Sequence, residues 1–199
     1  MPSRLWLHVS RASNVRLMIA EIDDNQIEAA VDLLCRFFRE EGFVGDREQI
    51  RANLDALRND AHHWAAVCIM DGKIAGVVTV TTMLYVEWGR LGEIGDLYVV
   101  PEFRMKGIAR SLVEAGIHWC RSHGCSAVAV TITREGETRH GLSRFYANFG
   151  FTPMDRISSV LRFGGLGRKS DRANRLLQSG SSGASCRCRS ADFGEGHGR

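Results

Sequence analysis

The sequence contains no apolar run that approaches the roughly 20 residues needed to cross a bilayer. The N-terminal stretch "LWLHV" is also too short to form the core of a signal peptide. The six cysteines are too few and too scattered for a disulfide scaffold, and the Cys186-Arg-Cys188 pair lacks the spacing of a zinc knuckle. We therefore expect a protein of the reducing cytoplasm that binds neither a membrane nor a metal.

A basic bias is also missing from most of the chain. The 199 residues include 26 basic and 23 acidic residues, which give a formal charge of +3. Seven basic and three acidic residues lie from Gly164 onward, so this tail carries +4 and residues 1–163 carry −1. The body of the protein therefore gives no electrostatic argument for nucleic acid as a partner.

Two common nucleotide-binding motifs are absent. The sequence contains no G-x-x-x-x-G-K-[ST] and no G-x-G-x-x-G. This excludes a P-loop and a Rossmann fingerprint as the means of binding phosphate.

The first half of the chain predicts a strand, two helices and a hairpin. A β-rich run over 15–20 precedes apolar residues spaced three and four apart over 27–38, and a second helical stripe includes Ile50, Leu54 and Leu57. Two further β-rich runs meet at Asp71-Gly72, a pair that favours a two-residue hairpin turn. We expect these two strands to pair antiparallel.

The second half predicts strands that alternate with helices. A strand over 91–100 is followed by a helix that Gly124 ends, a strand over 126–133, a short helix over 139–150 and a last strand over 157–163. This order predicts one α/β domain over 15–163, with a mixed sheet and helices on both of its faces. Residues 1–14 are expected to be a flexible extension, and 164–199, where Gly and Ser exceed a third of the residues, a disordered basic tail.

The stretch "RMKGIA", Arg104–Ala109, lies where the fourth strand of the domain passes into its long helix. Unpaired N–H groups of a first helical turn bind phosphate, and Gly107 lets a ligand approach the backbone closely. Arg104 and Lys106 add positive charge. The alternative is an ordinary turn whose basic side chains are only solvated.

The chain resembles the GCN5-related N-acetyltransferase (GNAT) family. "RMKGIA" matches that family's acetyl-CoA signature, [QR]-x-x-G-x-[GA], at the same place in the order of elements. A second family mark, an aromatic pair followed by Gly-Phe at the end of a helix, appears as "FYANFGF" over Phe145–Phe151. The resemblance spans Val15 to Phe163 and implies a mostly antiparallel sheet whose fourth and fifth strands splay apart.

The same resemblance implies how acetyl-CoA is held as co-substrate. Its pantetheine arm would pair with the main chain at Val99 and Val100, and the N–H of Val99 would polarise the thioester carbonyl. The pyrophosphate would lie on the backbone N–H groups of the signature, which are those of Arg104, Met105, Lys106, Gly107, Ile108 and Ala109.

Two side chains are candidates for the chemistry. Glu93, six residues before Val99 and on the same face of a regular strand, is the candidate general base. A bulge at Gly95 would change this parity and bring in Asp96 instead. Tyr146 matches the family tyrosine that protonates the leaving thiolate. The structural alternatives are a hydrogen-bonded carboxylate at a strand edge and a tyrosine that only packs in the core.

One departure from the family pattern concerns the pantetheine. The family often has an Asn seven residues before the tyrosine, where this chain has Arg139, followed by His140. The role of that Asn cannot be transferred, so neither residue is placed in the catalytic set.

The acceptor is expected beside two segments that mix carboxylates with aromatic rings. This composition suits a cationic small-molecule amine, with the aminoglycoside-modifying branch of the family as the favoured hypothesis. A protein or peptide acetyltransferase and a non-catalytic acyl-CoA sensor are the alternatives, and a homodimer is among the assemblies that the sequence leaves open. The residues concerned are Glu40, Glu41, Phe43 and Asp46 in the first segment and Tyr85, Glu87 and Trp88 in the second.

Overall fold

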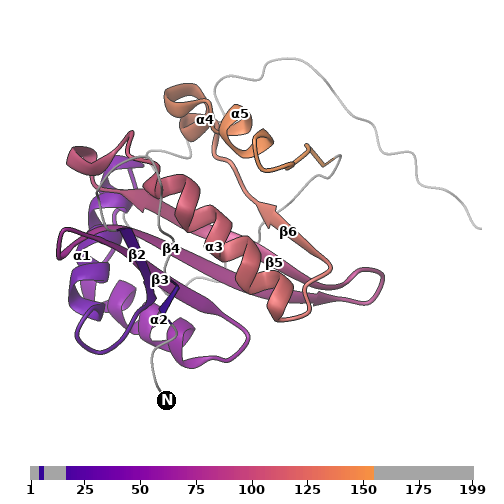
Figure 1. The fold of residues 1–199 in the computed structure, drawn as a ribbon, viewed down its shortest axis with the longest axis horizontal. Coiled ribbons are helices and arrows are strands. Elements are labelled where there is room, and N and C mark those ends of the chain that lie inside the picture. The colour runs from indigo at the N-terminus through magenta and orange to yellow at the C-terminus, as the bar shows by residue number, and fades with distance from the viewer. Residues whose placement is uncertain (1–4, 7–16, 155–199) are drawn as a thin grey trace, which may run out of the picture. The chain divides into compact units, whose positions relative to one another are not determined.

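The computed structural model describes residues 5–6 and 17–154 (Figure 1). Within these residues, six strands form one sheet in the order β1 to β6. Its β5–β6 pair is parallel, and its other neighbouring pairs are antiparallel. This confirms the predicted α/β class and mixed, mostly antiparallel sheet. The predicted strand over 157–163 and the tail over 164–199 lie outside the described residues.

The elements have the following bounds. The strands are β1 Leu5–Trp6, β2 Leu17–Glu21, β3 Trp64–Met70, β4 Lys73–Tyr85, β5 Gly89–Val99 and β6 Ala127–Val130. The helices are α1 Ile27–Glu40, α2 Arg47–Asn59, the 3-10 turn η1 Pro101–Phe103, α3 Ile108–Ser122, α4 Arg134–His140 and α5 Leu142–Ala147.

Local signals explain several of these boundaries. The Asp46 carboxylate accepts a hydrogen bond from the N–H of Glu48 and so caps the start of α2. Asp71 and Gly72 both have positive φ, 52° and 74°, as the tight turn between β3 and β4 requires. Gly124, with φ 73°, follows the end of α3. The hairpin turn at Asp71-Gly72 and the end of α3 before Gly124 lie where the sequence pattern placed them.

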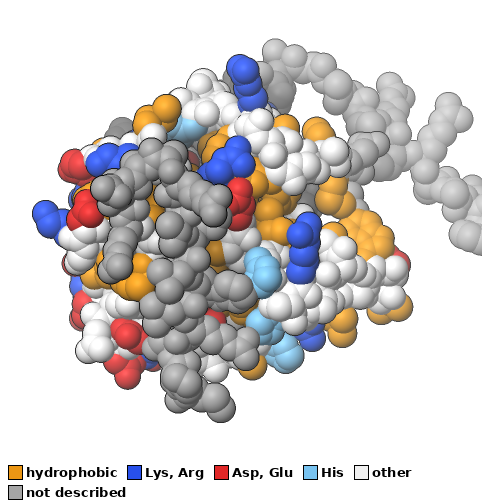
Figure 2. Space-filling model, in the orientation of Figure 1, with side chains coloured by type: hydrophobic (Ala, Val, Ile, Leu, Met, Phe, Trp, Pro, Cys, Tyr) orange, Lys and Arg blue, Asp and Glu red, His pale blue; other side chains and the backbone are white. Residues whose placement is uncertain are grey.

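Helices cover both faces of the sheet (Figure 1). On one face α3 buries Ile108, Leu112 and Trp119 against apolar residues of the strands. On the other face α1 and α2 bury Val31, Leu34 and Leu54. On the face of the domain shown in Figure 2, basic, acidic and apolar side chains are intermixed.

Two local features differ from the expectation. Leu5–Trp6 pairs antiparallel with Ala20 and Ile19 of β2, inside the segment expected to be a flexible extension. The short helix expected over 139–150 is α5, Leu142–Ala147, and an unexpected helix, α4, ends at His140 just before it, because Gly141 at φ 58° breaks the helical backbone between them. Among the described helices, none is both long and apolar enough to span a bilayer.

Candidate active site

The central feature of the site is the edge of β5 that has no partner strand among the described residues beyond Ile94. Its pairing with β6 runs from Leu91–Ala127 to Ile94–Val130, whereas β5 itself continues to Val99. Beyond Ile94 the two strands therefore part, as the predicted splay between the fourth and fifth strands of the domain requires (Figure 1).

The direction of the peptide groups shows what this edge offers. The N–H of Val100 donates to the carbonyl of Ala75, so it faces β4. Successive peptide groups of a strand face opposite edges, so those of Val99 and Leu97 face the gap. Of the two predicted backbone contacts, Val99 has its N–H toward the gap, whereas the N–H of Val100 is used within the sheet. Leu97 was not singled out from the sequence, although its spacing of two from Val99 would have indicated it.

The signature turn follows directly. The chain leaves β5 through η1, and Met105 and Gly107 adopt positive φ angles of 62° and 81° before α3 begins at Ile108. The N–H of Ser111 donates to the carbonyl of Gly107, which is the first bond of the helical pattern. The N–H groups just before it belong to the unpaired opening turn of the helix, a position that favours anions. The N–H of Arg104, in contrast, donates to the carbonyl of Pro101 at 3.1 Å, so the geometry suits the predicted phosphate contact at 105–109 and not at Arg104.

The basic side chains of the signature have definite partners. Arg104 donates from Nε to the Val99 carbonyl at 2.9 Å and pairs through its terminal nitrogen with Glu40 at 3.0 Å. The ammonium of Lys106 lies 5.0 Å from the centre of the Phe103 ring. The guanidinium of Arg104 is therefore bound to the end of β5 and to α1.

A β-bulge decides which way Glu93 points. The pairing of β4 with β5 shifts between Val78–Leu97 and Val80–Ile94, so one extra residue of β5 lies opposite Thr79. Ile94 and Val99 then both pack on the α3 face, and Glu93 lies on the opposite face. The regular pleat that would put Glu93 on the same face as Val99 is therefore absent, and the bulge considered at Gly95 is confirmed.

Both candidate carboxylates are hydrogen-bonded. Glu93 accepts a bond of 2.7 Å from the hydroxyl of Thr131, just beyond β6. Asp96 accepts one of 2.7 Å from the hydroxyl of Thr79 and returns its own N–H to that oxygen at 2.9 Å. Burial raises the pKa of Asp96, although the bond from Thr79 acts in the opposite direction. Glu93 thus connects β5 to the residue just beyond β6, where the two strands part. Asp96 connects the bulge of β5 to Thr79 of β4.

Tyr146 is packed in the core beside the end of β5. Its side chain is 4% exposed and makes edge contacts with the rings of Phe145 and Phe151, with centres 5.1 and 5.5 Å apart. Burial raises its pKa to about 12, so the hydroxyl stays protonated at neutral pH. It also shares an apolar cluster with Val99 at the end of β5 and with Ile108 of the signature turn. This position is compatible both with a core role and with proton donation.

Arg139 contacts α1. Its guanidinium donates to the main-chain carbonyl of Glu40 at 3.0 Å and pairs with Glu135 at 2.6 Å. The neighbouring His140 is exposed at the end of α4. Arg139 therefore ties α4 to the start of the α1–α2 loop.

The two predicted acceptor segments do not come together. Glu40 accepts a hydrogen bond from Tyr98 at one end of β5, whereas Tyr85 pairs with Gly89 at the other end. At roughly 3.3 Å per residue, nine residues of strand separate them by about 30 Å. The prediction that both segments line one site is therefore wrong, because the hairpin that carries Tyr85 and Trp88 extends away from the end of β5 that carries the signature.

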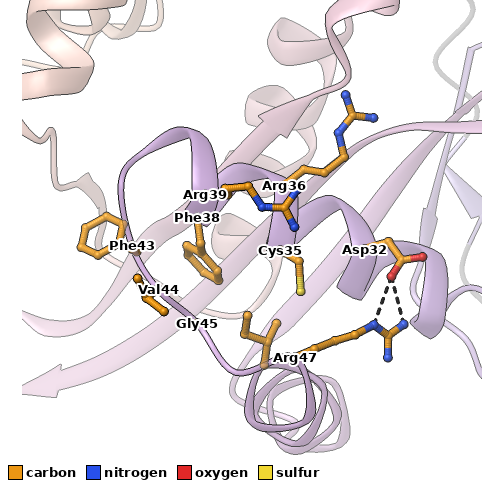
Figure 3. Close-up of a pocket in the computed structure, with 10 residues that line it drawn as sticks. Asp32, Cys35, Arg36, Phe38, Arg39, Phe43, Val44, Gly45 and Arg47 are labelled. Atoms are coloured by element: carbon orange, nitrogen blue, oxygen red, sulfur yellow. Dashed lines mark hydrogen bonds and ion pairs between the residues drawn. The ribbon is translucent and has the colours of Figure 1, made fainter. Parts of the chain in front are cut away.

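Two open pockets lie outside this group of residues. One of about 470 Å³ lies between α1 and α2 (Figure 3), and its lining includes Arg36, Arg39 and Arg47 as well as the apolar Phe38 and Phe43. Its arginines make it a poor site for a cationic acceptor. A second of about 410 Å³ lies between α3 and the residues that follow α5, and includes Arg110 and Phe149. A strand edge needs no preformed cavity to bind an extended ligand, so we base the site on the main chain of β5.

Within the described part of the chain, no group of three or more potential metal ligands forms.

Curated relatives match part of the chain. An uncharacterized N-acetyltransferase of Methanocaldococcus jannaschii is 28% identical over 98 residues, which are 48% of this chain and 42% of the relative. One of Archaeoglobus fulgidus is 31% identical over 84 residues, 41% of this chain and 55% of the relative. The chain thus spans about half the length of these relatives.

Solved structures share the fold. The aminoglycoside N-acetyltransferase AAC(6')-Iy in complex with CoA superposes with a TM-score of 0.66 at 17% identity, over 76% of this chain and 97% of that one. Its complex with the bisubstrate analogue CoA-S-monomethyl-acetylneamine gives 0.65 at 17% identity, over 74% and 99%. At this identity the likeness concerns the fold.

The family model of the acetyltransferase (GNAT) family matches residues 27–151, which include α1, the bulged strand β5, the signature turn and Tyr146. This stretch is more than half of the chain and contains every residue placed at the site. The chain belongs to the acetyltransferase (GNAT) family.

Proposed function

We propose that the protein transfers the acetyl group of acetyl-CoA directly to a primary amine of a small cationic molecule, with an aminoglycoside-type compound as the favoured acceptor. The observation that carries the proposal is the free main-chain edge of β5 beyond Ile94, which runs directly into a helix-opening turn suited to phosphate. An extended ligand with a diphosphate at one end matches both features.

The cofactor would be held mainly by main chain. The N–H groups from Met105 to Ala109 would bind its pyrophosphate, and the gap-facing peptide groups of Leu97 would pair with the pantetheine arm. When bound, acetyl-CoA supplies the acetyl group as a reactive thioester. The N–H of Val99 would donate to the thioester oxygen, where negative charge develops during attack.

Two side chains would then move protons. Glu93, beside the end of β6, would accept a proton from the amine, directly or through water. The Tyr146 hydroxyl, which its raised pKa keeps protonated, would donate to the departing sulfur. These roles make the transfer sequential, with no acetyl group on the protein.

Carboxylates support a cationic acceptor. Glu93 lies on the face of the sheet that α1 and α2 cover, and Glu41 at the start of the α1–α2 loop accepts a bond of 3.4 Å from Thr133, two residues beyond Thr131. Negative charge on one side of the thioester gap favours a cation there. The fold likeness to an aminoglycoside N-acetyltransferase adds an analogy, not a derivation.

A panel of amines tests the proposal. Release of coenzyme A thiol is followed with aminoglycosides, polyamines, amino acids and Lys peptides, and we expect turnover with the multiply charged small amines. Turnover on Lys peptides alone would establish the alternative, a protein acetyltransferase. Acetyl-CoA binding without turnover on any class would instead establish a non-catalytic sensor and overturn the proposal.

Replacing Tyr146 by Phe should lower kcat at least tenfold and leave the affinity for acetyl-CoA within about threefold, because only the proton donor is lost. The ring contacts with Phe145 and Phe151 remain, so we expect little change in Tm. Steady-state kinetics and calorimetry measure the two quantities. A fully active variant would assign Tyr146 to the core alone.

A further inference from the structure

The side chain of Arg104 does not lie as a phosphate ligand would. Its Nε donates to the Val99 carbonyl at 2.9 Å, and its terminal nitrogen meets Glu40 at 3.0 Å. The guanidinium carbon also lies 5.6 Å from the centre of the Tyr98 ring. All three contacts are with the end of β5 or with α1.

The bond to Val99 replaces one that a neighbouring strand would make. The carbonyl of Val99 faces the gap, and beyond Ile94 the sheet offers no partner from β6. In a continuous sheet this carbonyl would accept from the next strand. Arg104 takes that place from the side of the signature turn, and so fixes the last residue of β5 without closing the edge.

Glu40 holds Arg104 in this position. It also accepts a hydrogen bond of 2.6 Å from the hydroxyl of Tyr98, and its own main-chain carbonyl accepts from Arg139 of α4. Burial raises the pKa of Glu40, but the bonds from Tyr98 and Arg104 and the nearby arginines outweigh it, so its pKa lies below the ordinary value of 4.5. Glu40 is therefore charged at neutral pH. Through its side chain and its main-chain carbonyl it connects α1 to β5 and to α4.

We propose that Arg104 and Glu40 are positioning residues that aim the Val99 N–H into the thioester gap and tie the cofactor turn to the acceptor loop. We call their pairing the Arg104–Glu40 link. The inference rests on the proposed acetyl transfer, because the oxyanion that Val99 would stabilise belongs to that reaction. It assigns Arg104 to the chemical step and not to phosphate binding.

Replacing Arg104 by Lys separates these two roles. Lys keeps the positive charge but lacks the planar fork that reaches the Val99 carbonyl and Glu40 together. We expect kcat to fall about tenfold while the dissociation constant of acetyl-CoA changes by less than about threefold. If the Arg104 side chain instead bound phosphate, Arg104→Lys would keep the kcat of the wild-type protein. Only the neutral Arg104→Gln would then weaken acetyl-CoA binding. That result would overturn the proposal.

A double-variant cycle tests the partnership. Glu40→Gln removes the charge and should lower kcat by a similar factor, and the combination with Arg104→Lys should be no worse than either single change. If the double variant instead lost the product of the two single factors in kcat, the two residues would act separately. Arg51→Lys is the matched control, because Arg51 pairs with Glu28 at 2.6 Å between α1 and α2 but touches no part of β5. It should leave kcat and Tm unchanged.

A measurement without turnover separates this inference from the proposed function. In the ¹⁵N-labelled protein, Arg104→Lys and Glu40→Gln should shift the amide resonances of Val99 and Val100, whereas Arg51→Lys should not. If the two variants show these shifts but the wild-type protein neither binds acetyl-CoA nor acetylates any amine, the Arg104–Glu40 link stands as a structural feature and the proposed acetyl transfer is rejected. Unchanged resonances would reject the link itself.

Discussion

Replacing Gly107 by Glu should weaken the binding of acetyl-CoA at least 100-fold. The new carboxylate would lie at the opening turn of α3, where the pyrophosphate is expected. Two negative groups in contact at this turn would repel each other strongly. The backbone of Gly107 is left-handed, with φ 81°, so a side chain also costs about 1 kcal/mol of strain. A Cβ built there meets no atom within 4 Å, so the change should not disturb the packing of the protein itself. Isothermal calorimetry with acetyl-CoA measures the effect.

Gly124 at the other end of α3 provides the matched control. Its φ is 73°, and a Cβ there also meets no atom within 4 Å. Gly124→Glu therefore adds the same charge and a similar strain where no phosphate is expected. We expect a comparable loss of stability with affinity for acetyl-CoA kept. If Gly107→Glu bound acetyl-CoA as tightly as Gly124→Glu, the signature turn would not be the phosphate site.

Features set by local geometry could be predicted from the sequence. Asp71-Gly72 determines a hairpin because few other pairs accept two positive φ angles, and Gly107 marks a backbone that only a residue without a Cβ adopts freely. The signature turn was found for the same reason. Such residues report the shape of the chain within a few positions of themselves.

Features set by tertiary contacts could not be predicted. The link from Arg104 to Glu40 joins residues 64 positions apart, and nothing in "RMKGIA" distinguishes a guanidinium that binds phosphate from one that binds a carbonyl. The contact of α4 with α1 through Arg139 likewise joins residues 99 positions apart. The hairpin of Tyr85 and Trp88 was misplaced because β4 and β5 are longer than their apolar cores indicate.

The bulge in β5 depends both on local sequence and on tertiary contacts. Gly95 indicated it, but only the register with β4 decides on which face each carboxylate lies. As a result Glu93 and Asp96 share a face, and the choice between them as general base rests on their partners. Asp96 is held twice by Thr79, a side chain that is 2% exposed, while Glu93 has one hydroxyl partner at the edge of the gap.

Glu93→Gln should lower kcat about 100-fold, within the range of a lost general base, and leave acetyl-CoA affinity within about threefold. The amide oxygen can still accept from Thr131, so the local structure is kept while the proton acceptor is removed. Steady-state kinetics with the best amine of the panel measures kcat, and isothermal calorimetry measures the affinity for acetyl-CoA.

Asp96→Asn is the matched change three residues away, and it should affect stability more than catalysis. Because burial raises the folded-state pKa of Asp96 above 3.8, the folded protein binds this proton more tightly than the unfolded chain does. Its favourable contribution is therefore present at low pH and is lost as pH rises from about 4 through the folded-state pKa. Asn cannot ionise, so the variant should lose this decline in Tm while kcat falls less than about fivefold. A 100-fold loss in Asp96→Asn together with an active Glu93→Gln would transfer the role of base to Asp96.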